Sequence, residues 1–453
     1  MRVRELEQVE RKLEAWLLEM MGDLGRRERV EALTRYLYGL LLEGERKSIE
    51  PVAMRLVSDP AEAEAMRQRI QQAVSVAEWD EAIVFERIAR AAMKRLPGVD
   101  AWVLDDTGFP KKGYKSVGVQ RQYSGTLGRI DNCQVATSLH LASEQGGVCI
   151  GMRLYLPSEW AGDDKRRQKA GIPTDVPFEE KWKIGVRLID QARQWGIPDR
   201  IVVADAGYGD ATEFRAALVA RGLEYIVGVT GTAVAWPPGV MPKAPVPRPK
   251  GAPGRSRTRW VADDERPSSM NEIAAALPPQ RFRKVTWREG TRGAQSSRFA
   301  AIRIRTARRH TRGKPPGDEL WLLCEWPRGQ KAPSKLYLSN LPARTSLKRL
   351  VYLAKLRWRI ERDYQEMKGE LGLDHFEGRS WRGFHHHVAC VAAAHAFLAL
   401  ERVVFPPERT TTNIAEIPSV PSDRPAPRRR RMSPMLPTYR SSTAALALAD
   451  VIE

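Results

Sequence analysis

Hydrophobic residues recur at helical spacing in the first part of the chain. In residues 1–97 they are separated by steps of three and four, as on the buried face of an amphipathic helix. The helices predicted in this way are Val9–Leu18, Val30–Leu42 and Trp79–Leu96, with a further one that begins at Ser48. We therefore expect an N-terminal helical domain, 1–97. Its arginines and lysines suit docking on DNA, and packing on the next domain is an equally good interpretation.

From residue 98 onward, short apolar runs bounded by Gly, Pro and Asp predict strands that alternate with helices. The predicted strands are Ala101–Leu104, Cys133–Ala142, Val148–Leu156, Ile201–Ala204 and Tyr225–Val229, and the predicted helices are Phe178–Trp195 and Ala211–Arg221. Three strands, a helix, a strand, a helix, a strand and, after an interruption, a long helix follow the order of an RNase H-like domain. We predict an α/β, mixed-sheet catalytic core from 98–230 and 335–403.

The interruption, 231–334, has the pattern of a β-rich insertion domain that carries many arginines and lysines. Its predicted elements are a helix near Met270–Leu277 and strands at Arg281–Trp287, Arg298–Ile304, Leu320–Trp326 and Leu336–Ser339, the last just beyond the insertion. The Pro- and Arg-rich loop at 238–259 fits a solvated linker better than a DNA-binding segment.

Apolar residues at three- and four-residue steps predict one amphipathic helix over 353–376. Arg357, Glu361 and Lys368 are four and seven residues apart, so they share a second stripe of that helix. Taken alone, this stripe fits a solvated ladder of ion pairs. The alternative is a carboxylate that binds a metal ion, flanked by cations that meet phosphate.

The end of the chain predicts a helix followed by a tail. Residues 381–400 contain three consecutive histidines, which point in different directions on a helix and therefore make a single metal chelate improbable. We interpret them as phosphate-proximal or packing residues. Residues 404–453 are rich in Pro, Ser, Thr and Arg, which predicts a mostly disordered basic tail.

Composition points to an acidic polymer as the partner. The 453 residues carry a formal net charge of +19, which favours double-stranded DNA over an anionic membrane. No stretch reaches the roughly 18 uncharged apolar residues of a spanning helix, and the charged N-terminus is unlike a signal peptide. The four cysteines form no CxxC pair, so neither zinc nor a disulfide framework is indicated and a reducing cytoplasm is expected.

Three acidic positions stand out in the predicted core. Asp105 and Asp106 follow the first strand, Asp205 follows the fourth, and Glu361 lies on the late helix. Successive strand residues face opposite sides of a sheet, so one of the two neighbouring aspartates faces the site, and periodicity leaves open which one. Carboxylate oxygens suit Mg²⁺, and two such ions would support in-line displacement at phosphorus. The loop after the first strand contains Lys111 and Lys112, which form either a solvated turn or a contact to the phosphate backbone.

Several stretches together resemble one protein family. They are Leu40–Ser48 (LLLEGERKS), Leu104–Gly113 (LDDTGFPKKG), Ser116–Gly128 (SVGVQRQYSGTLG), Asn132–Gln134 (NCQ) and Val203–Gly209 (VADAGYG). The chain resembles the DDE transposases of insertion sequences, and more narrowly the insertion-sequence 701 type, a relative of the insertion-sequence 4 type. The resemblance covers about residues 30–400 and implies an RNase H-like core interrupted by a β-rich domain.

The resemblance also implies roles for individual residues. In the wider group the first catalytic aspartate directly precedes a threonine, which selects Asp106; the second falls on Asp205. The glutamate signature Tyr-x2-Arg-x3-Glu-x6-Lys is matched by Arg357, Glu361 and Lys368, whereas Ala354 occupies the tyrosine position. By resemblance, Asp106, Asp205 and Glu361 bind Mg²⁺ or Mn²⁺, and Arg357 and Lys368 contact phosphates.

The expected function is metal-dependent cleavage of DNA at the ends of an element and strand transfer to target DNA. Two ends brought together imply a homodimer on DNA, in a cytoplasmic, nucleoid-associated setting. The alternatives are a domesticated or inactive DNA-binding regulator, and a metal-dependent nuclease without strand transfer.

Overall fold

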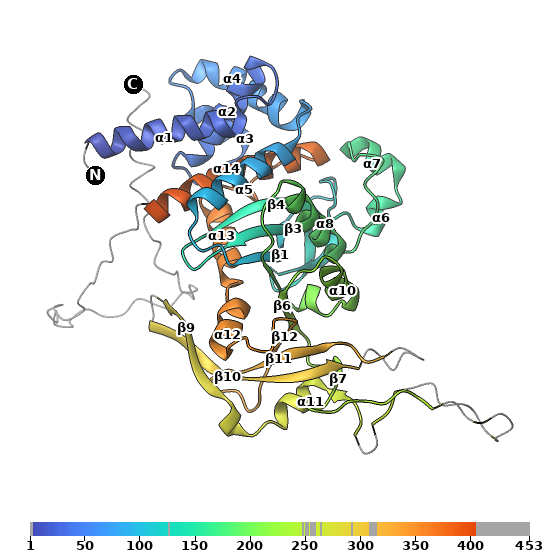
Figure 1. The fold of residues 1–453 in the computed structure, drawn as a ribbon. Helices are drawn as coiled ribbons and strands as arrows, with labels where there is room; N and C mark the ends of the chain where they lie inside the picture. Colours follow the sequence, from blue (N-terminus) through green and yellow to red (C-terminus); the bar gives the residue numbers. More distant parts are fainter. Residues whose placement is uncertain are drawn as a thin grey trace, which may run out of the picture.

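The computed structural model describes residues 3–404, apart from position 126 and the short stretches 247–248, 250–252, 254–259, 263–264, 291–292 and 308–314. The chain forms a mixed α/β protein in which helices cover one end of a long sheet (Figure 1). The predicted tail, 404–453, lies outside the described residues except for Val404, and so does much of the loop at 238–259.

The N-terminal part is helical, as the hydrophobic spacing predicts. Its main helices are α1 (Val3–Met21), α2 (Arg27–Leu41), α3 (Ile49–Arg55), α4 (Ala63–Gln71) and α5 (Glu81–Arg95). These helices pack on the late helix α14 (Trp381–Val404): the indole nitrogen of Trp16 donates to the carbonyl oxygen of Ala393 at 3.0 Å. Tyr36 is also buried there, 2.8 Å from Nδ1 of His387. Most of the apolar surface of these helices is therefore used in packing within the protein.

The core strands form one mixed sheet. They are β1 (Ala101–Pro110), β2 (Gln120–Ser124), β3 (Arg129–Ala142), β4 (Gly147–Leu154), β5 (Ile201–Ala204) and β6 (Tyr225–Val229). Strand β3 runs antiparallel to β1, β2 and β4, whereas β5 is parallel to both β1 and β6. Strand β2 was not predicted from the sequence, and β1 extends beyond its predicted end at Leu104. Its later residues are largely polar, but they remain paired with β3 as far as Pro110 opposite Cys133.

The strands of the interruption extend the same sheet. They are β7 (Val234–Trp236), β8 (Ser268–Ser269), β9 (Arg283–Gly290), β10 (Gly293–Thr306), β11 (Glu319–Trp326) and β12 (Lys335–Ser339), with the short helix α11 at Met270–Ala275. Strand β12 pairs antiparallel with β6 and so joins these strands to the core (Figure 1). The predicted strands are confirmed, and their hydrogen bonding is continuous with the rest of the sheet.

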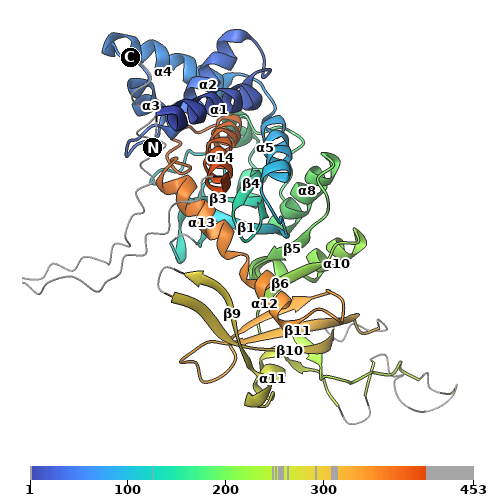
Figure 2. The ribbon, with the colours of Figure 1, turned by 60° about the vertical axis from the view of Figure 1, so that its left-hand side comes forward.

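The single helix predicted over 353–376 is wrong: two helices, α12 (Leu347–Lys355) and α13 (Trp358–Gly369), occupy this region. Backbone bonds between residues three apart tighten the chain at the junction, with the amide of Leu356 donating to Leu353 and that of Ile360 to Arg357. Helix α12 lies beside the insertion strands and α13 lies against β1 and β3 (Figure 2). Because of the break, the apolar faces of α12 and α13 pack on two different parts of the protein.

Helices of the core lie on both faces of the sheet. Helix α8 (Lys181–Gln194) contacts β3 on one face, and the short helices α9 (Ala206–Gly209) and α10 (Thr212–Ala220) follow β5. The excursion at 158–177, predicted as surface, carries two short helices, α6 (Ser158–Ala161) and α7 (Asp164–Ala170).

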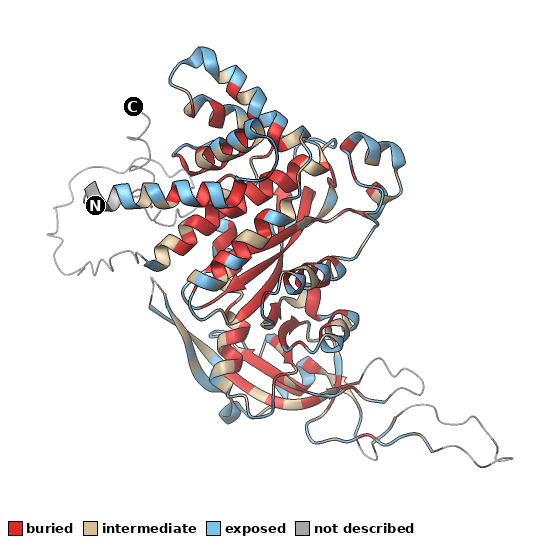
Figure 3. Ribbon diagram, turned by 45° about the horizontal axis from the view of Figure 1, so that its top comes forward, coloured by how far each residue is buried: buried red, intermediate tan, exposed pale blue. Residues whose placement is uncertain are grey.

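Helix α14 is the most buried helix of the core (Figure 3). Among the described residues it is the one helix long and apolar enough to cross a membrane, whereas the sequence had predicted no such stretch. However, 72% of its most apolar segment is buried inside the protein. His385, His386 and His387 are buried and bonded to backbone groups of neighbouring segments. Of the two interpretations of these histidines, packing is therefore the one observed.

Candidate active site

The register of β1 against β5 decides how the acidic residues face. The two strands are parallel, with Leu104 opposite Ala204, so the next residues, Asp105 and Asp205, come at the same level of the sheet. Asp205 keeps an extended backbone, with φ −82° and ψ −174°. Because side chains alternate between the faces of a strand, Asp105 and Asp106 point to opposite faces of β1. Asp205 comes just after the end of β5, and its charge acts on Asp105 and Arg357 as well as on Lys181.

Asp105 lies in a buried, positively charged setting beneath α13. Its side chain is buried, and Oδ2 is 2.5 Å from Nη1 of Arg357. The hydroxyl of Tyr364, also on α13, donates to the backbone oxygen of Asp105 at 3.3 Å. Burial raises the pKa of Asp105 from its ordinary 3.8 to about 7; Arg357 opposes this shift, whereas the charges of Asp205 and Asp106 reinforce it.

Arg357 connects Asp105 to Glu361. It stands at the start of α13, and its second terminal nitrogen is 2.7 Å from Oε1 of Glu361, whose side chain is half exposed. Burial acts to lower the pKa of Arg357, but the charges of Asp105, Glu361 and Asp205 outweigh it and raise the pKa. Asp105, Asp205 and Glu361 therefore all act on one guanidinium. Because Arg357 contacts Asp105 of β1 as well as Glu361, the stripe of Arg357 and Glu361 is more than a ladder of ion pairs on the helix surface.

Asp106 is held on the opposite face by a separate set of partners. Oδ1 accepts hydrogen bonds from Tyr208 of α9 and, at 3.0 Å, from the hydroxyl of Thr137, and Oδ2 forms an ion pair with Lys181 of α8. Burial acts to lower the pKa of Lys181, but Asp106 and Asp205 raise it overall. The role of Lys181, Tyr208 and Thr137 as partners of Asp106 could not be predicted from the sequence. They lie 31 to 102 positions away from Asp106, and no local pattern links residues so far apart.

Asp205 also serves a local structural role. Its Oδ1 accepts the backbone amide of Gly207 at 2.9 Å, which caps α9. The helix then lies so close to β6 that a Cβ at Gly209 would be 1.9 Å from the carbonyl oxygen of Gly228. The glycines of the Val203–Gly209 motif thus bring α9 and its Tyr208 against the sheet.

The basic residues expected at the site differ in their surroundings. Nζ of Lys368 donates to the carbonyl oxygen of Gly108 at 2.7 Å, and burial lowers its pKa to about 8. Nζ of Lys111 donates to the carbonyl oxygen of Phe376 at 2.8 Å. Lys112 is exposed. Lys368 and Lys111 therefore lie near the carboxyl end of β1, where each donates to a backbone carbonyl oxygen.

A buried ionic network that no sequence pattern predicts lies behind α13. Asp363 and Glu366 are both buried on this helix; Asp363 is 2.7 Å from Nδ1 of His140, and Glu366 is 2.6 Å from Nη1 of Arg402. A Cβ at Gly147 would lie 2.6 Å from Oδ2 of Asp363, so β4 approaches the pair closely. The network fixes the rotation of α13 and hence the direction in which Glu361 points.

The donor set suits a divalent cation in its chemistry. Asp105 and Asp205 come at the same level of the sheet, Arg357 contacts both Asp105 and Glu361, and hard carboxylate oxygens are the ligands that Mg²⁺ prefers. Burial, and after it the charges of Asp205 and Asp106, raise the pKa of Asp105, and a bound cation would favour the ionised form against both effects. Within the described part of the chain, however, no three acidic, histidine or cysteine side chains converge closely enough to hold an ion, and Arg357 bridges Asp105 and Glu361.

The raised pKa of Asp105 predicts a pH-dependent stability. Between pH 3.8 and about 7 the folded state keeps a proton that the unfolded state has lost, so this contribution to stability falls as the pH rises through that window. The slope is at most about 1.4 kcal/mol per pH unit. We expect the melting temperature of the cation-free protein to fall less steeply for Asp105→Asn than for the parent between about pH 5 and about pH 8. Identical slopes would contradict the shift.

Two comparisons relate the sequence of this chain to known proteins. The sequence model of the DDE superfamily endonucleases matches residues 19–294, more than half of the chain. The chain is also 34% identical over 128 residues to a probable transposase for insertion sequence element IS701 from Microchaete diplosiphon. That match covers 28% of this chain and 31% of the relative.

Proposed function

Because the chain belongs to the DDE superfamily endonucleases, we propose that it is a transposase, which cuts DNA at the ends of a mobile element and joins the freed 3′-hydroxyls to target DNA. The observation that carries this proposal is the parallel register that brings Asp105 and Asp205 together beneath Arg357 and Glu361. The net charge of +19 suits a polyanionic substrate, to which cations bind with release of counterions.

Three carboxylates are proposed to act at the reacting phosphate. Asp205 and Glu361 supply two of them. The sequence signature selects Asp106 as the third, and that choice remains a prediction; the contact with Arg357 of α13 favours Asp105. Magnesium or manganese, as two ions held by these carboxylates, would supply an activated oxygen nucleophile and stabilise the leaving oxygen.

The cations of this region have proposed roles in binding DNA. Arg357 is suited to exchange its carboxylate partners for a phosphate once those carboxylates are occupied, because a guanidinium binds both groups in the same bidentate way. Lys368 and Lys111, which donate to carbonyl oxygens near the carboxyl end of β1, and the exposed Lys112 would contact the DNA backbone on either side. Their positions near the carboxyl end of β1 support these roles.

The finer organisation of the chain is also a proposal. We divide it into an N-terminal helical domain (1–97), an RNase H-like core (98–230 and 335–403), a β-rich insertion (231–334) and a basic tail (404–453). The strand order β4-β3-β1-β5-β6 supports the RNase H-like assignment. A homodimer that holds two DNA ends, and a nucleoid location in the cytoplasm, follow from the proposed reaction.

A strand-transfer assay tests the function. The full-length protein, with Mg²⁺ or Mn²⁺, is incubated with a plasmid and with linear DNA that carries the sequences flanking its gene. We expect joined products from the parent, and neither cutting nor joining from Asp205→Asn, which still binds the DNA because it only removes a charge. Cutting without joining would indicate a nuclease, and binding alone a regulator; either result would overturn the transposase proposal.

A further inference from the structure

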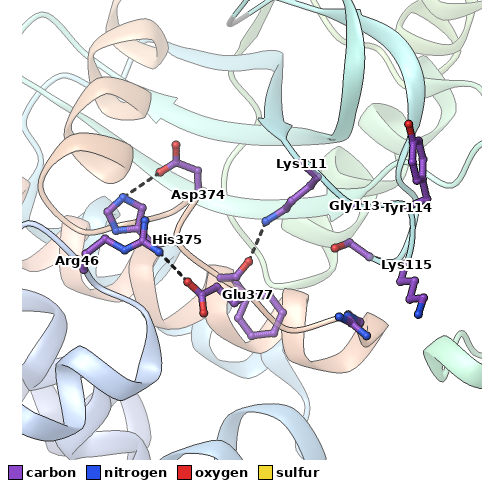
Figure 4. A pocket seen from close by; sticks show the side chains of 11 residues that line it. Arg46, Lys111, Gly113, Tyr114, Lys115, Asp374, His375 and Glu377 are labelled. Atoms are coloured by element: carbon purple, nitrogen blue, oxygen red, sulfur yellow. Dashed lines mark hydrogen bonds and ion pairs between the residues drawn. The ribbon is translucent and has the colours of Figure 1, made fainter.

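A hollow lined by basic residues lies where three distant segments meet. Its volume is about 580 Å³, and it is lined by the loop after α2, the loop after β1 and the loop between α13 and α14 (Figure 4). Four cations line it, Arg46, Lys111, Lys115 and Arg379, against the two carboxylates of Asp374 and Glu377. The hollow therefore has an excess of positive charge.

The cations of this hollow are available to a ligand. In the part of the chain that the structure describes, neither Lys115 nor Arg379 forms an ion pair or a side-chain hydrogen bond, and both are exposed. Arg46 pairs with Glu377 at 2.7 Å, but both side chains are about two-thirds exposed, so water screens the pair. Nζ of Lys111, at the rear, donates to the carbonyl oxygen of Phe376, and burial lowers the pKa of this lysine.

The walls of the hollow are held in place by buried contacts. The backbone amide of Lys47 donates to Nδ1 of His375 at 3.1 Å, and Nζ of Lys47 donates to the carbonyl oxygen of Leu40 at 3.0 Å. Gly372 has φ +68°, and a Cβ there would lie 2.3 Å from Cβ of Lys47. The loop after α2 is thereby fixed against the loop that follows α13, so Arg46 faces the hollow from a set position.

The hollow lies near the acidic site, by which we mean Asp105, Asp205 and Glu361. Helix α13 leads from Glu361 to Gly369, and the lining residue Asp374 follows a few residues later. Eight residues of helix extend ~12 Å, and successive nucleotides of a DNA strand are ~3.4 Å apart along the axis. A duplex bound at the acidic site thus reaches the hollow a few nucleotides away.

We propose that this hollow binds the phosphate backbone of duplex DNA a few nucleotides from the bond that is cut, and that the N-terminal helices take part in DNA binding through Arg46. The inference rests on the proposed function in that DNA is the partner. Tyr114, 72% exposed beside Lys115 at the rim, adds a hydroxyl donor and an aromatic face to the same surface.

The salt dependence of DNA binding tests the inference. Binding of the full-length protein to a fluorescent duplex from the DNA flanking its gene is measured by anisotropy over a range of salt concentrations, without a divalent cation. The slope of log K against log salt is negative, and each lost phosphate contact lowers its magnitude by about 0.9, so Lys115→Gln with Arg379→Gln is expected to lower the magnitude by up to about 1.8. Glu377→Gln, which removes a repelling carboxylate and frees Arg46, is expected to tighten binding.

A charge-matched control separates this site from overall charge. Arg90→Gln with Arg193→Gln removes two exposed cations that do not line the hollow and is expected to leave the slope unchanged. An equal fall in the magnitude of the slope for both double variants, or no fall for the first, would overturn the inference. Because no cleavage is measured, the outcome is independent of the strand-transfer assay: a protein that joins DNA with an unchanged slope refutes this site alone.

Discussion

Asp105→Asn is expected to abolish DNA cleavage, whereas Asp106→Asn is expected to retain it within about tenfold. Asp105 comes at the same level of the sheet as Asp205 and contacts Arg357, so its charge is proposed to act at the reacting phosphate. Loss of several kcal/mol of stabilisation there corresponds to a fall in rate on the order of 10³-fold or more. Cleavage of plasmid DNA by each variant, at equal protein concentration and with Mg²⁺, measures the difference.

The Asp106 variant should be less stable than the parent for a different reason. It leaves Lys181 without its carboxylate and weakens the hydrogen bonds from Tyr208 and Thr137, which amounts to about 1–3 kcal/mol. The cleavage assay is therefore run well below the melting temperature of the variant. Asp199→Asn, at the other end of β5 and paired with Arg193, is a matched control that should cut normally. Loss of cleavage in Asp106→Asn with activity kept in Asp105→Asn would show that the sequence signature, and not the contact with Arg357, identifies the residue.

Lys355→Met is expected to destabilise the protein by about 3–5 kcal/mol, because it leaves the buried carboxylate of Glu325 without its cation. Glu325 is 3% exposed, and its other partner is the hydroxyl of Tyr337 at 3.4 Å. The pair joins α12 to strands β11 and β12, where the core meets the insertion strands. Thermal unfolding, followed by circular dichroism, measures the effect as a lower melting temperature.

Two variants give this prediction its controls. Lys348→Met changes an exposed lysine of the same helix and is expected to shift the free energy of unfolding by less than about 0.5 kcal/mol. Lys355→Met combined with Glu325→Leu removes both charges and should recover most of the lost stability. A single variant as stable as the parent would show that the pair is not what holds α12 to these strands.

The predictions made from local patterns agree well with the structure. Strands β5 and β6 have the predicted bounds, and β11 and β12 begin within one residue of them. The order of elements in the core follows as well. Alternation and helical spacing are properties of neighbouring residues, and burial of one face is enough to produce them, so they are visible without knowledge of the fold.

Local patterns were weaker wherever distant segments decide the outcome. Hydrophobic spacing continues unbroken through Leu356, yet α12 and α13 separate there because they pack on different parts of the sheet. Missing β2 had a related cause: its residues are polar, and it is a strand because β3 provides hydrogen-bond partners.

By itself, the sequence determined that this is a basic α/β protein with acidic residues at strand ends and on a late helix. Only the tertiary structure decided that Asp105 contacts Arg357 of α13 and that Asp106 contacts Lys181 of α8, because both contacts depend on how distant helices pack on β1. It also decided that His140 meets Asp363 and that Arg46 meets Glu377. Spacing along a chain fixes which side of its own element a residue occupies, whereas the residue it meets across space is fixed by how the elements pack.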